Sequence, residues 1–320
     1  MKKLQYTVEQ IAFLHPANLE IEQLNEKKYH YYFIVSAPIM YINDIHLVDN
    51  AIVFILNDGK ENFEVTLLSD KDKYTITDFT WKYKQENDKV TALLSYTINH
   101  KNGCEKRLKD LEFAANDVYY LCEKKLKFKI EYIGQSYAQN GSRTAQNRLS
   151  SHSTLQKILT DSSVERNKDI RLFLLGVDIA CIDNKSLTGN ESSIFYLRDV
   201  DVAISSDHVN LFEAYLINTF KPKYNKNFVS GEVPSECHGS YKKVIEEAYD
   251  DFSVVFAIQD CTKDYIFFTE SKSLEIVGGI IATPHSNGVI DTDAIKVPFN
   301  EANKVYDKDY EYSFEAVTSK

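Results

Sequence analysis

The chain has 320 residues, of which 43% are hydrophobic and 26% are charged, and its formal net charge at pH 7 is -10. This composition is typical of a folded protein with sizeable cores and room for two or three domains. The sequence contains no apolar run of about 18 residues and no hydrophobic leader at its start, so we expect a cytoplasmic protein without a membrane span.

The five cysteines are far apart in the sequence and include no closely spaced pair. This pattern predicts neither a zinc site nor a disulfide framework. We therefore expect free thiols in a reducing compartment, which agrees with a cytoplasmic location.

The charge is spread unevenly along the chain. Residues 106–229 carry 18 Lys and Arg against 15 Asp and Glu, whereas residues 1–105 carry 11 against 15 and residues 230–320 carry 8 against 17. A basic segment within an acidic chain suits a surface that binds polyanions. A merely uneven spread without functional meaning is the alternative.

Residues 1–105 are expected to form a β-rich accessory domain that follows a short helix at 8–24. Aromatic and apolar residues alternate with polar ones over several stretches, which is the period of half-buried strands. Strands are expected at 31–39, 51–56, 63–68, 78–84 and 90–98. The residues Asn57-Asp58-Gly59 predict a hairpin turn between two of these strands.

Residues 106–229 are expected to form a second, mixed domain after a polar linker. The pattern predicts a hairpin of strands 116–121 and 127–133, helices at 143–159 and 207–220, an apolar strand at 169–179 and a polar insertion at 183–201. Residues 230–320 are expected to form an acidic α+β domain. It begins with a linker at 231–240, and its elements are a helix at 241–249 and strands at 253–258, 265–269 and 275–282.

Two tripeptides lie on the expected hairpin of the middle domain. The first is Asp117-Val118-Tyr119, and the second is Tyr132-Ile133-Gly134. Two tyrosines on neighbouring strands more often pack against each other than catalyse a reaction. The pair therefore indicates a function only in combination with other residues.

The helix that follows the hairpin offers a cationic side chain. Arg148 lies in the run Arg148-Leu149-Ser150-Ser151-His152, and His152 falls on the same helical face. A guanidinium group remains charged at all relevant pH values and binds two phosphate oxygens at once. Arg143 is the competing candidate, and for His152 an ordinary surface histidine is the alternative reading.

Glu213 lies within an apolar stripe of the helix expected at 207–220. Val209, Leu216 and Phe220 recur at helical spacing, and Glu213 falls on the same side. A carboxylate in such a place is unfavourable unless it is paired or binds a cation. An ion pair with a lysine is the alternative to a metal site.

The complete set of residues, over roughly residues 115–228, resembles the GIY-YIG nuclease superfamily. The members of the set are Tyr119, Tyr132-Ile133-Gly134, Arg148, Glu213 and Asn225, the last within Pro222-Lys223-Tyr224-Asn225. Asp117 departs from the pattern because the family has a glycine at that position. The flanking segments resemble no family.

The resemblance implies an α+β fold in which helices flank a small three-stranded antiparallel sheet. It implies an endonuclease that hydrolyses DNA with a divalent metal, Mg²⁺ or Mn²⁺, bound by Glu213. Tyr119, helped by Tyr132, would orient or deprotonate the attacking water, Arg148 would hold the phosphate, and Asn225 would fix the adjoining loop. Lys129 and His152 would be auxiliary residues. The expected products carry a 5′ phosphate and a 3′ hydroxyl.

Restriction, defence against phage or plasmid DNA, and repair are the biological roles that such an enzyme would serve. The alternative is a catalytically inactive module that binds nucleic acid or is regulated by a partner. The acidic flanking domains, which repel a DNA duplex, are candidates for contacts with a protein partner or with a second copy of the chain.

Overall fold

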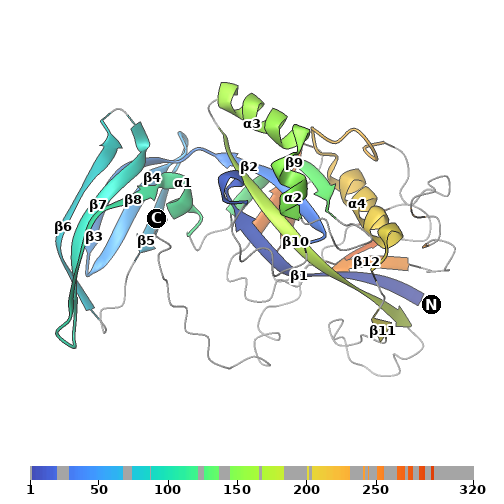
Figure 1. The fold of residues 1–320 in the computed structure, drawn as a ribbon, viewed down its shortest axis with the longest axis horizontal. Helices are drawn as coiled ribbons and strands as arrows, with labels where there is room; N and C mark the ends of the chain where they lie inside the picture. Colours follow the sequence, from blue (N-terminus) through green and yellow to red (C-terminus); the bar gives the residue numbers. More distant parts are fainter. Residues whose placement is uncertain are drawn as a thin grey trace.

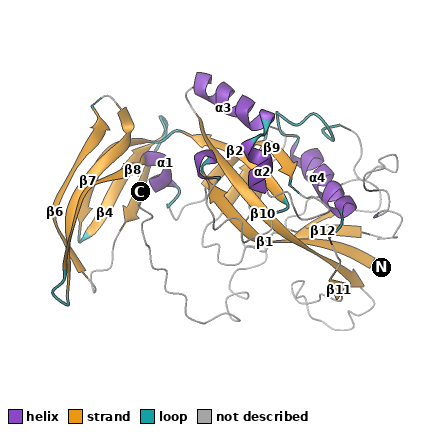
Figure 2. Cartoon of the chain, viewed as in Figure 1, coloured by secondary structure: helices purple, strands orange, loops and turns teal. Residues whose placement is uncertain are grey.

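The structure is a computed structural model that describes most of the first 230 residues and parts of the remainder (Figure 1). The described residues are 2–19, 29–67, 74–86, 88–121, 126–136, 145–165, 168–183, 200–201, 204–230, 241, 244, 251–255, 265–270, 273–276, 281–284 and 290–291. The fold is α+β, as the sequence predicts, and strands predominate in it (Figure 2).

The main sheet has ten described strands and takes them from all parts of the chain. Its order is β14-β13-β9-β2-β10-β1-β12-β15-β16, and β11 pairs with β10. The strands are β1 (Lys2–Leu14), β2 (Tyr31–Pro38), β9 (Leu126–Gln135), β10 (Lys168–Asp183), β11 (Val200–Asp201), β12 (Asp251–Val255), β13 (Tyr265–Phe268), β14 (Ser273–Ile276), β15 (Ile281–Pro284) and β16 (Ile290–Asp291). The expected division at residues 105 and 229 is therefore not reflected in the strand pairing.

Two smaller sheets lie between β2 and β9 in the sequence, and we call residues 39–125 the inserted module. One sheet consists of β3 (Tyr41–Val48), β4 (Ala51–Asn57) and β5 (Asn62–Leu67), and the other of β6 (Tyr74–Gln85), β7 (Asp88–His100) and β8 (Glu105–Ala114). A short helix, α1 (Ala115–Tyr119), follows them. Figure 1 shows the inserted module at one end of the molecule, to the left of the main sheet.

Helices cover both faces of the central strand β2. The helices α2 (Ala145–Ser150) and α3 (Ser153–Glu165) share an apolar cluster with Tyr32 and Ile34. The helix α4 (Ser206–Phe220) packs on the other face, where its Phe212 meets Tyr31. A short 3-10 helix follows β1 (Pro16–Asn18). Among the described helices, none has both the length and the apolar character needed to cross a membrane.

Most elements expected from alternation or helical spacing are confirmed. They are the strands at 31–39, 51–56, 63–68, 78–84, 90–98, 127–133, 169–179 and 265–269 and the helix at 207–220. The strands expected at 253–258 and 275–282 are confirmed in part, by β12 and by β14 with β15. The linker at 231–240 and nearly all of the helix at 241–249 and the insertion at 183–201 lie outside the described residues.

Three expectations are wrong. The helix expected at 8–24 is a strand up to Leu14, because β1 fills the gap between β10 and β12. The strand expected at 116–121 is the helix α1, so it forms no hairpin with β9. The helix expected at 143–159 is interrupted at His152, whose Nδ1 accepts a hydrogen bond from the Leu155 amide 3.3 Å away and thereby caps α3.

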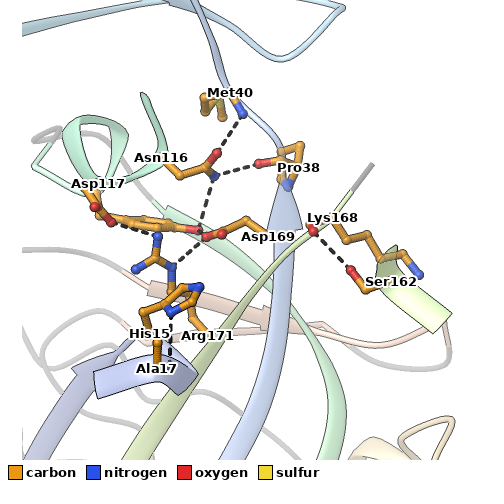
Figure 3. Close-up of polar contacts among 11 residues, drawn as sticks. His15, Ala17, Pro38, Met40, Asn116, Asp117, Ser162, Lys168, Asp169 and Arg171 are labelled. Carbon is orange, nitrogen blue, oxygen red and sulfur yellow. Dashed lines mark hydrogen bonds and ion pairs between the residues drawn. The ribbon is translucent and has the colours of Figure 1, made fainter. Parts of the chain in front are cut away.

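A polar cluster fastens the inserted module to the main sheet, as Figure 3 shows. The Arg171 guanidinium of β10 donates to Asp169 over 2.6 Å and to Asp117 of α1 over 2.7 Å. Tyr120 donates to Asp169 over 2.7 Å, and the Arg171 guanidinium lies 4.9 Å from the centre of its ring. Asn116 donates to the Pro38 carbonyl at the end of β2. The start of α1 is thus held by both β2 and β10.

Candidate active site

Two tyrosines meet on neighbouring antiparallel strands, but they are Tyr32 and Tyr132. In the register of β2 and β9, Tyr32 lies opposite Gly134 and Ile34 lies opposite Tyr132. The two phenol rings are 6.1 Å apart with an interplanar angle of 27°. Tyr32 is fully buried, whereas Tyr132 is partly exposed.

Gly134 leaves the space in which these rings meet. A Cβ atom at this position would lie 2.5 Å from both Cζ and Oη of Tyr32 and 2.8 Å from Cε1 of Tyr132. Because such distances are shorter than a van der Waals contact, only glycine fits between the rings. The close approach of side chains, rather than an unusual backbone angle, explains the glycine of the second tripeptide.

His152 and Arg148 approach the same phenol from the helical side. The His152 Nε2 atom lies 3.1 Å from the Tyr32 hydroxyl, and its ring centre lies 5.2 Å from that of Tyr132. Because Nδ1 accepts from the Leu155 amide, the proton of the neutral imidazole resides on Nε2, which donates to Tyr32. Arg148 of α2 also hydrogen-bonds to Tyr32. Arg143, the competing candidate, lies outside the described residues.

Glu213 belongs to α4, which packs on the other face of the sheet, and its carboxyl group interacts electrostatically with this group. Burial raises the pKa of its carboxyl group to about 7, although the positive charge of Arg148 and hydrogen bonds from Gln135 oppose the rise. The carboxylate also raises the pKa of Tyr132 and, more weakly, that of Tyr32. These mutual effects show that Glu213 interacts electrostatically with both phenols and with Arg148.

Burial sets the protonation of the other members. It raises the pKa of Tyr32 and of Tyr132 above the ordinary phenol value. It also lowers the pKa of His152, and Arg148 lowers that pKa further. Near pH 7 the phenols are therefore protonated and His152 is neutral, so Arg148 is the permanent cation of the group.

Asn225 has a structural place at this site. Its Oδ1 atom accepts from the Ile133 amide over 2.9 Å, and its Nδ2 atom donates to the Ile133 carbonyl over 2.8 Å. The Tyr224 amide donates to the Glu131 carbonyl on the same strand. These hydrogen bonds fasten the segment after α4 to the part of β9 that carries Tyr132.

Two residues expected at the site are not part of this group. Tyr119 lies in α1 of the inserted module, where its ring packs 5.1 Å from that of Phe63. Lys129 lies near the other end of β9, and its Nζ atom is 3.1 Å from a carboxylate oxygen of Glu270. The structure therefore brings together Tyr132, Arg148, His152 and Glu213, with Asn225 beside them.

Sequence reasoning missed Tyr32 and Gln135. The strand at 31–39 was predicted, but the inserted module separates Tyr32 of this strand from Tyr132 in the sequence. Tyr119, which is much closer in the sequence, therefore seemed the natural partner. A possible signal was the apolar run of 31–35, which is too hydrophobic for an edge strand of an accessory domain.

The donors beside Glu213 suit a hard divalent cation. The groups there that can offer an oxygen atom to a metal ion are the carboxylate itself, the two phenols and the side-chain amide of Gln135. Within the described residues, no cluster of three or more His, Cys, Asp or Glu side chains suits a metal ion. A single carboxylate therefore fits Mg²⁺ or Mn²⁺ that retains several waters, and does not fit zinc.

An open pocket of about 770 Å³ lies elsewhere, beside the cluster of Figure 3. Its charged lining includes Arg171, Asp117 and Asp169, which already bind one another. Since these groups satisfy one another, we place the candidate active site at the tyrosine pair, where burial raises the pKa of the Glu213 carboxyl group.

A scan against models of protein families finds no match to this chain, and searches of curated proteins and of solved structures find none either. The interpretation of the site therefore depends on its own geometry.

Proposed function

We propose that the chain is a metal-dependent endonuclease that hydrolyses phosphodiester bonds of DNA. The observation that supports this most is the meeting of Tyr32, Tyr132, Arg148, His152 and Glu213 from β2, β9, α2, the α2–α3 junction and α4. The family that the sequence resembles combines two tyrosines, an arginine, a glutamate and an asparagine. Here Tyr32 takes the role first assigned to Tyr119.

Arg148 binds the scissile phosphate in this proposal. Its guanidinium stays ionised and carries donors in a planar fork that matches two phosphate oxygens. Its hydrogen bond to Tyr32 fixes its direction relative to the tyrosine pair. The developing negative charge of the pentacovalent phosphorus is then stabilised by a cation that is already in place.

The two tyrosines have different tasks because their exposures differ. Tyr32 is fully buried and accepts hydrogen bonds from His152 and Arg148, so it organises the site without contacting solvent. Tyr132 is partly exposed and is the phenol that contacts the attacking water. Since its pKa is raised, it orients this water at neutral pH through hydrogen bonds.

The cleavage itself is a displacement at phosphorus. The oxygen of the oriented water forms a bond to phosphorus and releases a proton to solvent, while the bond to the 3′ oxygen breaks and the departing oxygen takes up a proton from solvent. The products carry a 5′ phosphate and a 3′ hydroxyl. A divalent cation held by Glu213 would polarise the phosphate and stabilise the leaving oxygen.

The test is the cleavage of supercoiled plasmid by the full chain with Mg²⁺ or Mn²⁺. We expect Glu213→Gln and Arg148→Ala to lose at least about 100-fold in rate, a size typical for removal of a group that stabilises transition-state charge. Tyr132→Phe should also be strongly impaired. Tyr119→Phe is the matched control, and it should cleave like the unchanged protein.

Equal cleavage by the Glu213→Gln and unchanged chains would refute the metal assignment. Binding of DNA without any cleavage, under conditions in which the chain is folded, would favour the inactive binding module. Supercoiled, linear, single-stranded and branched DNA and RNA assayed in parallel would define the substrate.

The biological setting that we propose is restriction, defence against phage or plasmid DNA, or repair in the cytoplasm. The exposed free thiol of Cys104 agrees with a reducing compartment. The acidic segments that flank residues 106–229 are where we propose contacts with a protein partner or a second copy. Size-exclusion chromatography of the chain alone and with DNA tests this part of the proposal.

A further inference from the structure

The helix α4 is attached to the main sheet at three places along its first half. The Tyr6 hydroxyl of β1 donates to the His208 carbonyl, and the Tyr31 hydroxyl of β2 donates to the Val209 carbonyl. Phe212 stacks on the ring of Tyr6 at 4.7 Å. These contacts fix the backbone of the helix, but none of them touches the carboxylate of Glu213.

Gln135, the last residue of β9, is the attachment that reaches this carboxylate. Its side-chain amide and its backbone amide lie close enough to Glu213 to favour the ionised form of that carboxyl group. Its Nε2 atom also donates to the Asn210 Oδ1 atom over 2.7 Å. Because an amide nitrogen carries two protons, it can bind Asn210 and Glu213 together.

The spacing of Asn210 and Glu213 on α4 lets both residues face the Gln135 side chain. Asn210 and Glu213 are three residues apart and therefore neighbours on one side of the helix. Asn210 accepts one proton of the Gln135 side-chain amide, which leaves the other proton available to the Glu213 carboxylate on the next turn of α4. The carboxylate is in this way tied to the strand that also carries Tyr132 and Gly134.

We propose that Gln135 is a positioning residue that orients the Glu213 carboxylate for a divalent cation. This inference rests on the proposed function, because it assumes that Glu213 binds the metal. Groups that hydrogen-bond to a metal ligand fix its orientation, and their loss typically weakens metal binding about 10-fold to 100-fold. The backbone amide of Gln135 remains after any substitution, so the lower end of this range is expected.

The experiment measures binding of Mn²⁺ alone to the full chain, by electron paramagnetic resonance of the free ion. The variants are Gln135→Leu, which removes the amide at similar size, Asn210→Ala, which removes the acceptor that directs it, and Glu213→Gln. Gln85→Leu, at the exposed end of β6 in the inserted module, is the matched control. Thermal unfolding of each variant shows whether it is folded.

We expect Gln135→Leu to bind Mn²⁺ about 10-fold more weakly than the unchanged chain, Asn210→Ala to show a smaller loss, and Gln85→Leu to show none. Cleavage of plasmid by Gln135→Leu should lose kcat at fixed Mn²⁺ and recover at higher Mn²⁺, with the KM for DNA unchanged. A purely structural role would not give recovery by metal. If Gln135→Leu does not fold, Asn210→Ala decides the question by the same two measurements.

The two levels of the proposal fail in different ways. If the unchanged chain and Glu213→Gln bind Mn²⁺ equally, the metal assignment of the proposed function fails, and the role of Gln135 fails with it. If Glu213→Gln loses binding while Gln135→Leu and Asn210→Ala both retain it, the proposed function stands and the positioning role of Gln135 is refuted.

Discussion

At Glu213, burial and charge act on the same carboxyl group in opposite directions. Burial raises its pKa, whereas Arg148 and Gln135 favour the ionised form, and the net result is a pKa of about 7. The group therefore changes its charge within the physiological range of pH. Since a cation binds only the ionised form, metal binding and deprotonation are coupled.

This coupling predicts the pH dependence of cleavage. At limiting Mg²⁺, the rate should rise with pH through about 7, because only about a tenth of the carboxyl groups are ionised one pH unit below the pKa. At saturating Mg²⁺ the midpoint should move to lower pH, since the cation stabilises the ionised form. Plasmid cleavage between pH 5.5 and 8.5 at two Mg²⁺ concentrations measures both effects.

Stability without metal provides the control for this prediction. Between pH 4.5 and about 7 the folded chain retains a proton on Glu213 that the unfolded chain has released, so this group lowers stability as the pH rises. Glu213→Gln lacks this effect. In EDTA, its Tm relative to that of the unchanged chain should increase from pH 5 to pH 8, and a constant difference would contradict the raised pKa.

Gly134 gives a second prediction for a single residue. In Gly134→Ala the new Cβ atom collides with Cζ and Oη of Tyr32, which is fully buried and cannot move aside freely. We expect a loss of about 1–3 kcal/mol in the free energy of unfolding and a large loss of cleavage. Urea unfolding and the plasmid assay measure the two effects.

A double variant separates the collision from the loss of a hydroxyl group. Adding Tyr32→Phe removes Oη but leaves Cζ, so it should not restore the stability of Gly134→Ala. Restored stability in the double variant, or cleavage by Gly134→Ala at the unchanged rate, would contradict the packing described here.

For single residues, the sequence is informative where local chemistry decides the outcome. Glu213 could be singled out because a carboxylate in an apolar stripe requires a partner, and Arg148 because of its helical context. Tyr32 could not, since its partner across the sheet depends on which strands pair. Gln135 could not be singled out either, because the role we propose for it depends on its proximity to Asn210 and Glu213 of α4, which lie far away in the sequence.

At the scale of elements, Arg171 of β10 joins the inserted module to the main sheet. It is buried, and it binds Asp169 of its own strand and Asp117 of α1. Arg171→Met would leave these carboxylates without their cation, one of them largely buried. We expect a loss of about 3 kcal/mol in the free energy of unfolding, measured by urea denaturation.

The chain offers a matched control for this substitution. Arg107 of β8 forms an exposed ion pair with Glu105 over 2.8 Å. Because solvent screens such a pair, Arg107→Met should change the free energy of unfolding by less than about 1 kcal/mol. Equal effects of the two substitutions would show that the cluster of Figure 3 does not hold the module in place.

Helix α1 and the break at His152 show why some elements escaped prediction. Residues 116–121 are apolar and aromatic enough for a strand, but the Asn116 side chain bonds to the Met40 amide and the Pro38 carbonyl. Tertiary contacts thus override local preference. His152 interrupts the expected helix because its imidazole caps α3, a role that residue spacing alone does not indicate.

At the scale of the whole molecule, the sequence suggested three consecutive domains, whereas the pairing gives one main sheet and a module within it. The reason is that β2 and β9 are neighbours in the sheet although residues 39–125 separate them in the chain. Composition and charge change gradually along a chain and contain no information on such long-range pairing. The α+β class, by contrast, follows from local patterns and was predicted correctly.

The apolar packing predicts how the whole molecule unfolds. A single cluster of buried residues extends from α4 through the main sheet to the inserted module. One link in it is Tyr120, which stacks on Phe128 of β9 at 5.6 Å and meets Phe13 of β1 edge-on at 4.9 Å. Because the module and the sheet share this core, they should unfold together rather than as separate domains.

The only tryptophan of the chain provides the measurement, since Trp81 lies in β6 of the inserted module. In a urea titration, the change in its fluorescence should coincide with the loss of cleavage activity, which reports on the main sheet. Tyr120→Ala removes the aromatic link and should separate the two transitions. Two transitions in the unchanged chain would instead mean that the module folds independently and that its attachment contributes little to the stability of the active site.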